Sequence, residues 1–405
     1  MIYLLRCIEC GAEYEDKIIY TCNRCDGLLE VIYDLENIRE KYSLQYLKTK
    51  NLGVWKYKPI LPVSSEPVTM DEGATRLIYC ENISKSLKVK LYVKNEGDNP
   101  TGSFKDRGMT VGVTKALEFG TKVVACASTG NTSASMSAYA SKAGIEAIVL
   151  LPAGKIAAGK LSQALVYGAK VIAIGGNFDA AMNLIKKATQ MWDIYLLNSL
   201  NPYRLEGQKT LGLEVFEQLG FRFPDKFILP IGNAGNISAL WKGISEYKEL
   251  GLSEKTPELY GVQANRASPI ADYFQNKRDK IIFVENPETV ATAIRIGKPV
   301  NYPKAIKAIE ESHGYCISVS DQDILNAQRL LARKEGIFVE PASASSIAGV
   351  IKLRENGFID KNEIVVSIAT GHGLKDPDII YKQFKSDIRY IHADIYSLKE
   401  VLKIG

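Results

Sequence analysis

Long apolar runs are missing from this sequence of 405 residues, since no stretch approaches the roughly 18 uninterrupted apolar residues that a membrane span requires. Low-complexity tracts and solenoid-type repeats are missing as well. Charge of one sign is scarce, because 51 Lys and Arg face 46 Asp and Glu for a net charge of +5. We therefore expect a folded protein with neither a membrane nor a nucleic acid as its partner.

Cysteine is sparse and odd in number, with seven in the chain. The first residues, 1–7, include a short apolar stretch but no preceding basic region and no small-residue cleavage site, so they lack the pattern of a secretory signal. An odd cysteine count fits a reducing compartment, and we expect a cytoplasmic location. Cys80, Cys126 and Cys316 stand alone and are expected to be small core residues.

The other four cysteines form two close pairs, Cys7 with Cys10 and Cys22 with Cys25, separated by eleven residues. Each Cys-x-x-Cys turn presents two thiolates to one side, and two such turns suit a tetrahedral zinc ion. The stretches before the pairs, 1–6 and 16–21, are strand-like. We predict a small four-cysteine ribbon over 1–33 with these cysteines as candidate zinc ligands; a hairpin of four thiols without metal is the alternative.

Beyond residue 60, apolar runs of strand length alternate with amphipathic stretches of helix length, which is typical of α/β proteins with parallel sheets. The expected strands are 89–93, 122–126, 147–151, 170–174, 227–230, 258–263 and 363–369. The expected helices are 106–119, 132–143, 155–167, 178–192, 205–219, 237–250, 321–335 and 343–355. We expect the tail after Asp378 to pack as a final helix or strand.

One lysine lies where a polar, irregular segment turns into a helix. Ser103 and Asp106 have the spacing of a capping box, which places Lys105 in the first helical turn. There the helix dipole and the nearby Arg107 disfavour the protonated amine, so Lys105 is suited to Schiff-base chemistry with an aldehyde. Taken alone, a lysine at a helix start is more simply a solvated side chain.

A glycine-rich loop, Gly232 to Asn236, lies between an apolar run and a helix and is arranged as a nest of backbone amides for a phosphate. It lacks the Gly-x-Gly-x-x-Gly of a dinucleotide site and the Gly-Lys-Ser or Gly-Lys-Thr of a P-loop. The segment 128–133 also ends a strand and opens a helix. An imine-forming lysine together with a lysine-free phosphate cradle indicates pyridoxal 5′-phosphate.

Six motifs extend this pattern over residues 66–378, at 100–108, 128–133, 232–236, 291–297, 340–344 and 370–376. With them the chain resembles the fold-type II pyridoxal-phosphate enzymes, the tryptophan synthase β family, and most closely the threonine synthases. The resemblance implies an α/β fold of two three-layer α/β/α domains with mainly parallel sheets, beside the small N-terminal ribbon. A large cofactor-binding domain would comprise 34–110 and 205–405, and a smaller α/β domain 111–204.

The resemblance also implies a role for each site residue. Lys105 would hold the cofactor as a Schiff base and later move protons. The remaining cofactor-binding residues would be Asn131 at the pyridine 3′-oxygen, Gly232, Asn233, Ala234, Gly235 and Asn236 at the phosphate, and Thr370 at the ring nitrogen. The substrate-binding residues would be Ser128, Thr129, Thr132 and Ser133 at the carboxylate, and Asn198, Ser199 and Arg204 at a second phosphate. From the residues alone, Thr370 could equally cap a strand end and Arg204 could lie on the surface.

The implied reaction is that of a lyase in threonine biosynthesis, which eliminates phosphate from the γ-carbon of O-phospho-L-homoserine and adds water at Cβ to give L-threonine. Alternatives of the same fold are a cysteate synthase, using O-phosphoserine and sulfite, and a serine or threonine dehydratase. A zinc-ribbon nucleic-acid-binding protein is the alternative from another class, and the acidic residues Glu9, Glu13, Glu15, Asp16 and Asp26 count against it. The partner would be a small phosphorylated amino acid, with a homodimer left open.

Overall fold

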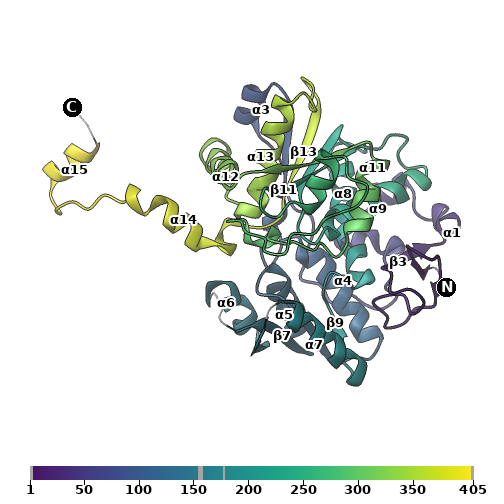
Figure 1. The fold of residues 1–405 in the computed structure, drawn as a ribbon. Helices are drawn as coiled ribbons and strands as arrows, with labels where there is room; N and C mark the ends of the chain where they lie inside the picture. The colour runs from purple at the N-terminus through teal and green to yellow at the C-terminus, as the bar shows by residue number, and fades with distance from the viewer. Residues whose placement is uncertain (1–2, 154–157, 177, 403–405) are drawn as a thin grey trace.

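A computed structural model describes residues 3–153, 158–176 and 178–402 and contains three sheets within those ranges. Figure 1 shows the largest sheet and its helices in the upper part of the molecule, with a smaller α/β unit below them. The mixed α/β architecture with mainly parallel strands confirms the predicted fold class.

The N-terminal ribbon is an antiparallel sheet of order β2-β1-β3. Its strands are β1 (Tyr3–Cys7), β2 (Glu13–Tyr14) and β3 (Leu29–Tyr33). The expectation of a strand over 16–21 is wrong, because this segment contains no strand and only Thr21 forms an isolated bridge, to Leu28. Polar side chains of this segment, Asp16 and Tyr20, instead bond to residues outside the ribbon.

The large sheet has the order β12-β11-β10-β13-β5-β4, and all its neighbours pair in parallel except the edge strand β4. Its strands are β4 (Leu77–Tyr79), β5 (Lys90–Asn95), β10 (Lys226–Pro230), β11 (Glu258–Ala264), β12 (Tyr315–Val319) and β13 (Ile364–Ala369). The central strands are buried on both faces, as continuous apolar runs require.

Helices cover both faces of the large sheet, and each face has its own apolar core. One core packs β5, β11 and β13 against α3 (Glu81–Leu87), α12 (Asp321–Glu335) and α13 (Pro341–Glu355). The other packs β10 and β11 against α8 (Pro202–Gln218), α9 (Gly235–Glu249), α10 (Pro269–Gln275) and α11 (Tyr302–Glu311). This gives the three layers of an α/β/α domain.

The smaller sheet has the order β8-β7-β6-β9 and is entirely parallel. Its strands are β6 (Val123–Ala127), β7 (Glu146–Pro152), β8 (Lys170–Ile174) and β9 (Tyr195–Leu196). The helices beside it are α4 (Lys105–Glu118), α5 (Asn131–Ala143), α6 (Ala158–Val166) and α7 (Phe178–Met191). The expected helix start at 155–157 lies outside the described residues.

Short helices join these units. They are α1 (Leu35–Arg39), α2 (Leu44–Lys48) and the 3-10 helices η1 (Val54–Ile60), η2 (Glu96–Asp98), η3 (Thr292–Ile294), η4 (Gly373–Lys375) and η5 (Lys385–Asp387). The tail forms α14 (Pro377–Phe384) and α15 (Ile395–Leu402), neither with a buried residue. It is helical as expected, and α14 contacts α12, where Arg329 and Arg333 lie over the Phe384 ring. The rest of the tail is mostly exposed and extends to the left in Figure 1. No described helix is long and apolar enough to cross a membrane.

A buried ionic network joins β5, α4 and α8. Arg107 donates to Glu96 through Nε at 2.6 Å and to Glu214 through Nη2 at 2.8 Å. Lys94 donates to Glu214 at 2.8 Å and to Gln218 at 2.9 Å. The side chains of the two cations and two carboxylates are fully buried, so each charge is compensated inside the protein and the network fixes α4 against α8.

Candidate active site

Three neighbouring parallel strands of the large sheet end at the predicted site. β10, β13 and β5 lie side by side. β10 leads into the glycine loop 232–236, β13 into Thr370, and β5 through η2 into the segment that ends at Lys105. Parallel strands present their carboxyl ends at one edge of a sheet, so the three segments meet there. The Phe104 N–H donates to the Thr370 carbonyl at 3.0 Å, which joins two of them directly.

Lys105 is the first residue of α4 and has a partly buried side chain. Its Nζ lies 4.1 Å from the centroid of the Phe104 ring, and no hydrogen bond or ion pair from any described residue reaches it. Removal of the amine from water, reinforced by the positive charge of Arg204, lowers the pKa of Lys105 to about 7. A large fraction of the amine is therefore neutral and nucleophilic near neutral pH.

The expected capping box at the start of α4 is wrong. The residue preceding the helix is Phe104, with no side-chain cap, and the buried Ser103 hydroxyl has no partner. The Asp106 carboxylate accepts instead from the Thr101 N–H at 2.7 Å and from the Ser135 hydroxyl at 2.5 Å. Burial raises the pKa of Asp106 to about 6. The bond from Thr101 ties the turn before Lys105 to the first turn of α4, and the bond from Ser135 ties α4 to α5.

The expectation that Arg107 lowers the Lys105 pKa is also wrong. The Arg107 guanidinium is engaged by Glu96 and Glu214 in the buried network, whereas the cation that acts on Lys105 is Arg204. Sequence proximity suggested the wrong arginine, because residues two apart in a helix point in different directions.

The glycine loop is held in place by close contacts with its surroundings. A Cβ on Gly232 would lie 3.0 Å from the Ala293 carbonyl oxygen, and one on Gly235 would lie 3.1 Å from Leu205. Ala234 precedes α9 in the left-handed conformation with φ of 65°. The buried Asn236 Nδ2 has no hydrogen-bond partner. The loop thus combines a helix amino terminus with an orphaned donor, as an anion site does.

Asn131, Glu340 and Thr370 surround the edge of the sheet near Lys105. The Asn131 Nδ2 donates to the two Glu340 carboxylate oxygens at 3.1 and 3.2 Å. The Thr370 hydroxyl lies 3.1 Å from that of Ser343. Burial raises the pKa of Glu340. Two residues predicted to face the cofactor ring are thus held by residues of one motif, 340–344.

Arg204 lies in the first turn of α8 with 2% of its surface exposed, so it is not a surface residue. Its Nε and Nη2 are buried without any hydrogen-bond partner. Burial lowers the pKa of Arg204 to about 10, which still leaves it charged at neutral pH. An unpaired guanidinium is costly to bury, so this group is complementary to an anion that comes from outside the chain.

The residues before Arg204 form a tight loop. The Asn198 side chain both accepts from and donates to the Ala127 backbone at 3.0 Å, which leaves a second N–H on its Nδ2. The Ser199 carbonyl accepts from Asn301 at 3.0 Å, and its residue is partly exposed. The Asn201 side chain caps α8 by accepting from the Arg204 N–H at 3.3 Å. Hydrogen bonds to Ala127, to Asn301 and to the first turn of α8 therefore hold this loop in place.

Helices α4 and α8, which carry Lys105 and Arg204, approach each other at glycines. A Cβ on Gly207 would lie 1.8 Å from the Arg107 carbonyl oxygen, and one on Gly108 would lie 2.7 Å from the Arg204 carbonyl oxygen. One on Gly112 would lie 2.9 Å from Arg204 Cγ. The two backbones therefore touch, and no other residue type fits at this crossing.

The predicted carboxylate-binding residues begin α5 directly after β6. Ser128 and Thr129 precede the helix, Asn131 is its first residue, and Thr132 follows, all partly exposed. The Ser133 hydroxyl is directed back to the Gly130 carbonyl at 2.9 Å. The first turn leaves backbone N–H groups available at its start, as an anion site requires.

These residues suit pyridoxal phosphate. The site offers a free amine for the aldehyde, a glycine cradle with an orphaned amide donor for the phosphate, and a buried hydroxyl at Thr370 for the ring nitrogen. Each of these groups is complementary to one part of the cofactor. Their roles remain predictions.

The four ribbon cysteines come together as predicted. Their Sγ atoms all lie within 4.8 Å of one another, with Cys7 and Cys25 at 3.5 Å and Cys10 and Cys22 at 3.6 Å. The Tyr14 hydroxyl, 3.0 Å from the Cys22 Sγ, lowers the pKa of that thiol to about 6. Four sulfurs at this spacing fit a tetrahedral zinc ion.

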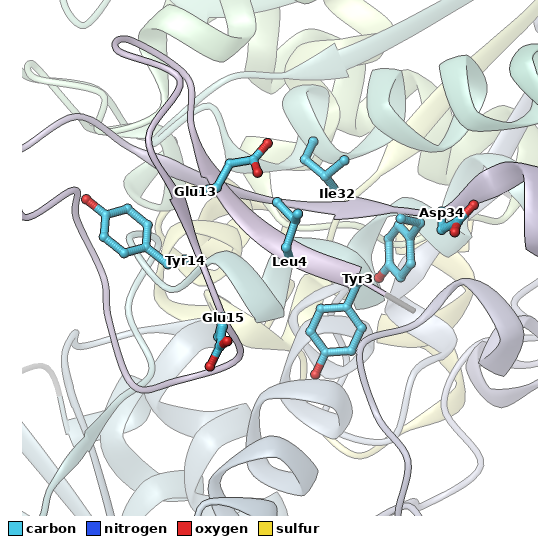
Figure 2. Close-up of a pocket in the computed structure, with 8 residues that line it drawn as sticks. Tyr3, Leu4, Glu13, Tyr14, Glu15, Ile32 and Asp34 are labelled. Carbon is cyan, nitrogen blue, oxygen red and sulfur yellow. The ribbon is translucent and has the colours of Figure 1, made fainter. Parts of the chain in front are cut away.

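A surface hollow on the N-terminal ribbon contains none of the predicted site residues in its lining, and Figure 2 shows the side chains that line it. It is lined by Tyr3, Leu4, Glu13, Tyr14, Glu15, Ile32, Tyr33 and Asp34. Three carboxylates in its lining disfavour a phosphorylated ligand.

Sequence analysis assigned no role to two residues of the site. Glu340 holds Asn131, and Lys375 donates to Gln163 of α6 at 2.5 Å. Burial lowers the pKa of Lys375, against the opposing effects of Asp106 and Glu340. A carboxylate directly before Pro341 at the start of an apolar helix was the available signal for Glu340; nothing local marked Lys375.

Comparison with known proteins identifies the family. The model of the family "Pyridoxal-phosphate dependent enzyme" matches residues 68–371. Threonine synthase of Methanocaldococcus jannaschii is 56% identical over 99% of both chains, and that of Methanosarcina acetivorans is 57% identical over 99% of both. Threonine synthase of Bacillus sp. is 50% identical over 86% of this chain and 97% of its own.

Solved structures show the same fold at low identity. Maize serine racemase has a TM-score of 0.65 and 22% identity over 77% of this chain and 92% of its own. The processed form of threonine deaminase isoform 2 from Solanum lycopersicum has a TM-score of 0.60 and 22% identity over 74% of this chain and 83% of its own. The free lysine, the glycine cradle and these matches agree, and the chain belongs to the pyridoxal-phosphate dependent enzymes, in the group of the threonine synthases.

Proposed function

We propose that this enzyme converts O-phospho-L-homoserine to L-threonine, releasing phosphate from the γ-carbon and adding water at Cβ. The observation that carries the proposal is the pair of anion receptors beside one neutral amine. The glycine loop accounts for the phosphate of the cofactor, and the unpartnered Arg204 guanidinium is left for a second anion. The relatives named threonine synthase support the same activity.

The cofactor supplies an electron sink that stabilises negative charge at the substrate carbons. Lys105 holds the cofactor through its amine and, with a pKa lowered to about 7, takes and returns protons at the substrate Cα and Cβ. Arg204 stabilises the departing phosphate as its charge increases. The start of α5 orients the substrate carboxylate.

Glu340 and Ser343 hold the side chains of Asn131 and Thr370, which would contact the ring of the cofactor when it is bound. Thr370 offers a neutral hydroxyl, which stabilises a protonated ring nitrogen less than a carboxylate would. This favours elimination and replacement over transamination.

The proposal includes further parts. The large cofactor domain comprises 34–110 and 205–405, and the small domain 111–204; the smaller sheet lies within the latter. We also propose a cytoplasmic enzyme with no nucleic-acid partner, and a homodimer that equilibrium sedimentation would test.

The test compares phosphate release from O-phospho-L-homoserine with release from O-phospho-L-serine in the presence of sulfite. We expect release, and L-threonine as the product, from the first substrate alone. Turnover of phosphoserine with sulfite would instead identify a cysteate synthase, and deamination of serine or threonine a dehydratase. Retention of cofactor after borohydride treatment by wild type, and its loss in Lys105→Ala, checks the attachment site independently of turnover.

A further inference from the structure

The segment 196–204 carries Arg204 and the other residues predicted to receive the substrate phosphate. It runs from β9 through a tight loop into the first turn of α8. No side chain of the described residues bonds the Arg204 Nε or Nη2. The guanidinium is therefore positioned by its backbone and by the packing of its stem, and anything that fixes this backbone sets the position of the anion receptor.

Both ends of this segment are held by one loop of the N-terminal ribbon. The Tyr20 hydroxyl accepts a hydrogen bond from the Leu196 N–H at 2.7 Å. At the other end, the Tyr203 hydroxyl donates its proton to the Asp16 carboxylate at 2.8 Å and also lies 3.0 Å from the Lys17 carbonyl oxygen. Tyr203 is 1% exposed and directly precedes Arg204.

A second connection runs through the start of α11. The Lys304 Nζ donates to the carbonyl of Leu29 in β3 at 2.6 Å. One turn earlier, the Asn301 Nδ2 donates to the Ser199 carbonyl at 3.0 Å, and the Asn301 N–H donates to the Asn233 carbonyl at 3.1 Å. These bonds link the ribbon to the segment 196–204 and to the glycine loop.

The shape of the ribbon loop depends on the cysteine cluster. Residues 11–21 contain only the two-residue strand β2 and connect Cys10 to Cys22, whose Sγ atoms lie 3.6 Å apart. A metal ion bound by the four thiolates closes this loop at both ends. Without the ion, the loop gains conformational freedom, and Asp16 and Tyr20 lose their fixed positions.

We propose that the four-cysteine ribbon acts as a brace, meaning that it holds the backbone of the segment 196–204. Asp16 and Tyr20 are the positioning residues that bond to this segment, and a metal ion in the cysteine cluster keeps these two residues in place. This inference rests on the proposed function. It assigns the ribbon to substrate binding; Lys105 and the glycine loop also follow strands of the large sheet, which supports them in addition.

The test uses the full-length holoenzyme with two variants that barely change side-chain size. Tyr20→Phe removes the bond to the Leu196 N–H. Asp16→Asn weakens the bond from Tyr203 and also removes the charge that pairs with Lys115 of α4. We expect the KM for O-phospho-L-homoserine and the dissociation constant of inorganic phosphate, measured by calorimetry, to rise about fivefold, the effect of losing about one hydrogen bond. kcat and the absorption spectrum of the cofactor should stay unchanged, because binding is weakened equally in the ground and transition states.

Glu13→Gln is the matched control, because it breaks a ribbon bond of Glu13 to Arg6 that is exposed and does not touch the segment. It should leave KM and the phosphate dissociation constant unchanged. If the ribbon only stabilised the fold, Asp16→Asn would lower the melting temperature with no change in phosphate affinity. That result would overturn the proposal.

Metal removal gives a second measurement. Treating the holoenzyme with a thiol-compatible chelator should raise the phosphate dissociation constant at least as much as Tyr20→Phe, and adding zinc should restore it. An unchanged constant after the metal is lost would overturn the proposal. If wild type does not turn over phosphohomoserine while its phosphate affinity still depends on Tyr20 and zinc, the proposed function fails and the brace remains.

Discussion

Helices α4 and α8 each contribute residues to two regions, the buried ionic network and the candidate active site. Positive side chains are paired with carboxylates in the first region and are left unpaired in the second. In the ionic network, Arg107 bonds to the carboxylates of Glu96 and Glu214, and Lys94 bonds to that of Glu214. At the sheet edge, no carboxylate of the described residues bonds to Lys105 or to the Nε and Nη2 of Arg204, although the charge of Glu340 acts on Lys105 without contact. Only two positions separate Lys105 from Arg107, so the difference lies in the direction of each side chain.

This difference distinguishes a core from a binding site better than burial does. A buried cation with its counter-charges is complete and fixes the fold. A buried cation without them carries a desolvation cost that only an incoming anion offsets, and it needs no reorganisation when that anion arrives. Lys105 avoids part of this cost by releasing its proton, because its pKa lies at about 7.

The largest expected effect is the loss of catalysis in Lys105→Ala. Removing the amine should lower kcat by at least about 10³-fold, because a proton-transfer group and the attachment point are lost together. Thermal stability in the absence of cofactor should not fall, since no partner is left unpaired. A melting curve and a single-turnover assay check both parts; a large drop in melting temperature would show that Lys105 belongs to the core.

Arg107→Met should destabilise the fold by about 3–5 kcal/mol, because Glu96 and Glu214 remain buried without the guanidinium. Urea unfolding of the wild type and the variant measures the difference. A loss below about 1 kcal/mol would mean that the network is not the anchor described here.

The same substitution at the other arginine should act on binding instead. Arg204→Met removes an unpaired charge, so we expect the free energy of unfolding to stay the same or rise. The KM for phosphohomoserine should increase by about tenfold or more, as one charge-assisted contact to a phosphate is lost. If both arginine variants lose stability equally, the contrast between the two regions is wrong.

A pH titration sharpens the contrast further. The pKa of Lys105 is about 7 in the native state and 10.5 without the protein environment. Between these two pH values the unfolded chain binds one more proton than the native protein. The free energy of unfolding of the cofactor-free protein should therefore rise with pH by up to about 1 kcal/mol per pH unit, and this gain should be lost as the pH falls towards 7. Lys105→Met should lack this contribution. Parallel pH profiles for the two proteins would contradict the lowered pKa.

The smallest effect should come from an exposed ion pair. Lys85 donates to Glu81 at 2.6 Å on the surface of α3, with most of both side chains in water. Lys85→Ala should change the free energy of unfolding by less than about 0.5 kcal/mol. A larger value in urea unfolding would mean that distance alone, without burial, decides the strength of a pair in this protein.

Sequence alone predicted the parts of this molecule that depend on local pattern. The strand 170–174 and the helix 321–335 match β8 and α12 residue for residue, because apolar periodicity and caps are local signals. The strand 16–21 failed because its hydroxyl and carboxylate side chains serve distant partners such as Leu196 and Tyr203. Long-range contacts leave no periodic trace.

The site follows the same division. Lys105 and the glycine loop were recognisable because each begins a helix with a distinctive local sequence. Which arginine acts on Lys105 was not predictable, since Arg204 lies about a hundred positions away and reaches the amine only through the packing of α4 on α8. Electrostatic partners are set by tertiary structure, and local spacing points to the wrong neighbour when a residue such as Arg107 is already paired.

The glycine crossing of α4 and α8 has a consequence for which molecules fit. Because main chain touches main chain at Gly108 and Gly207, the backbones from which Lys105 and Arg204 extend are held at one separation. If the proposed function holds, this separation is suited to phosphohomoserine, which is one methylene longer than phosphoserine. A larger residue at either glycine would meet the backbone of the other helix, force the two helices apart and change that separation.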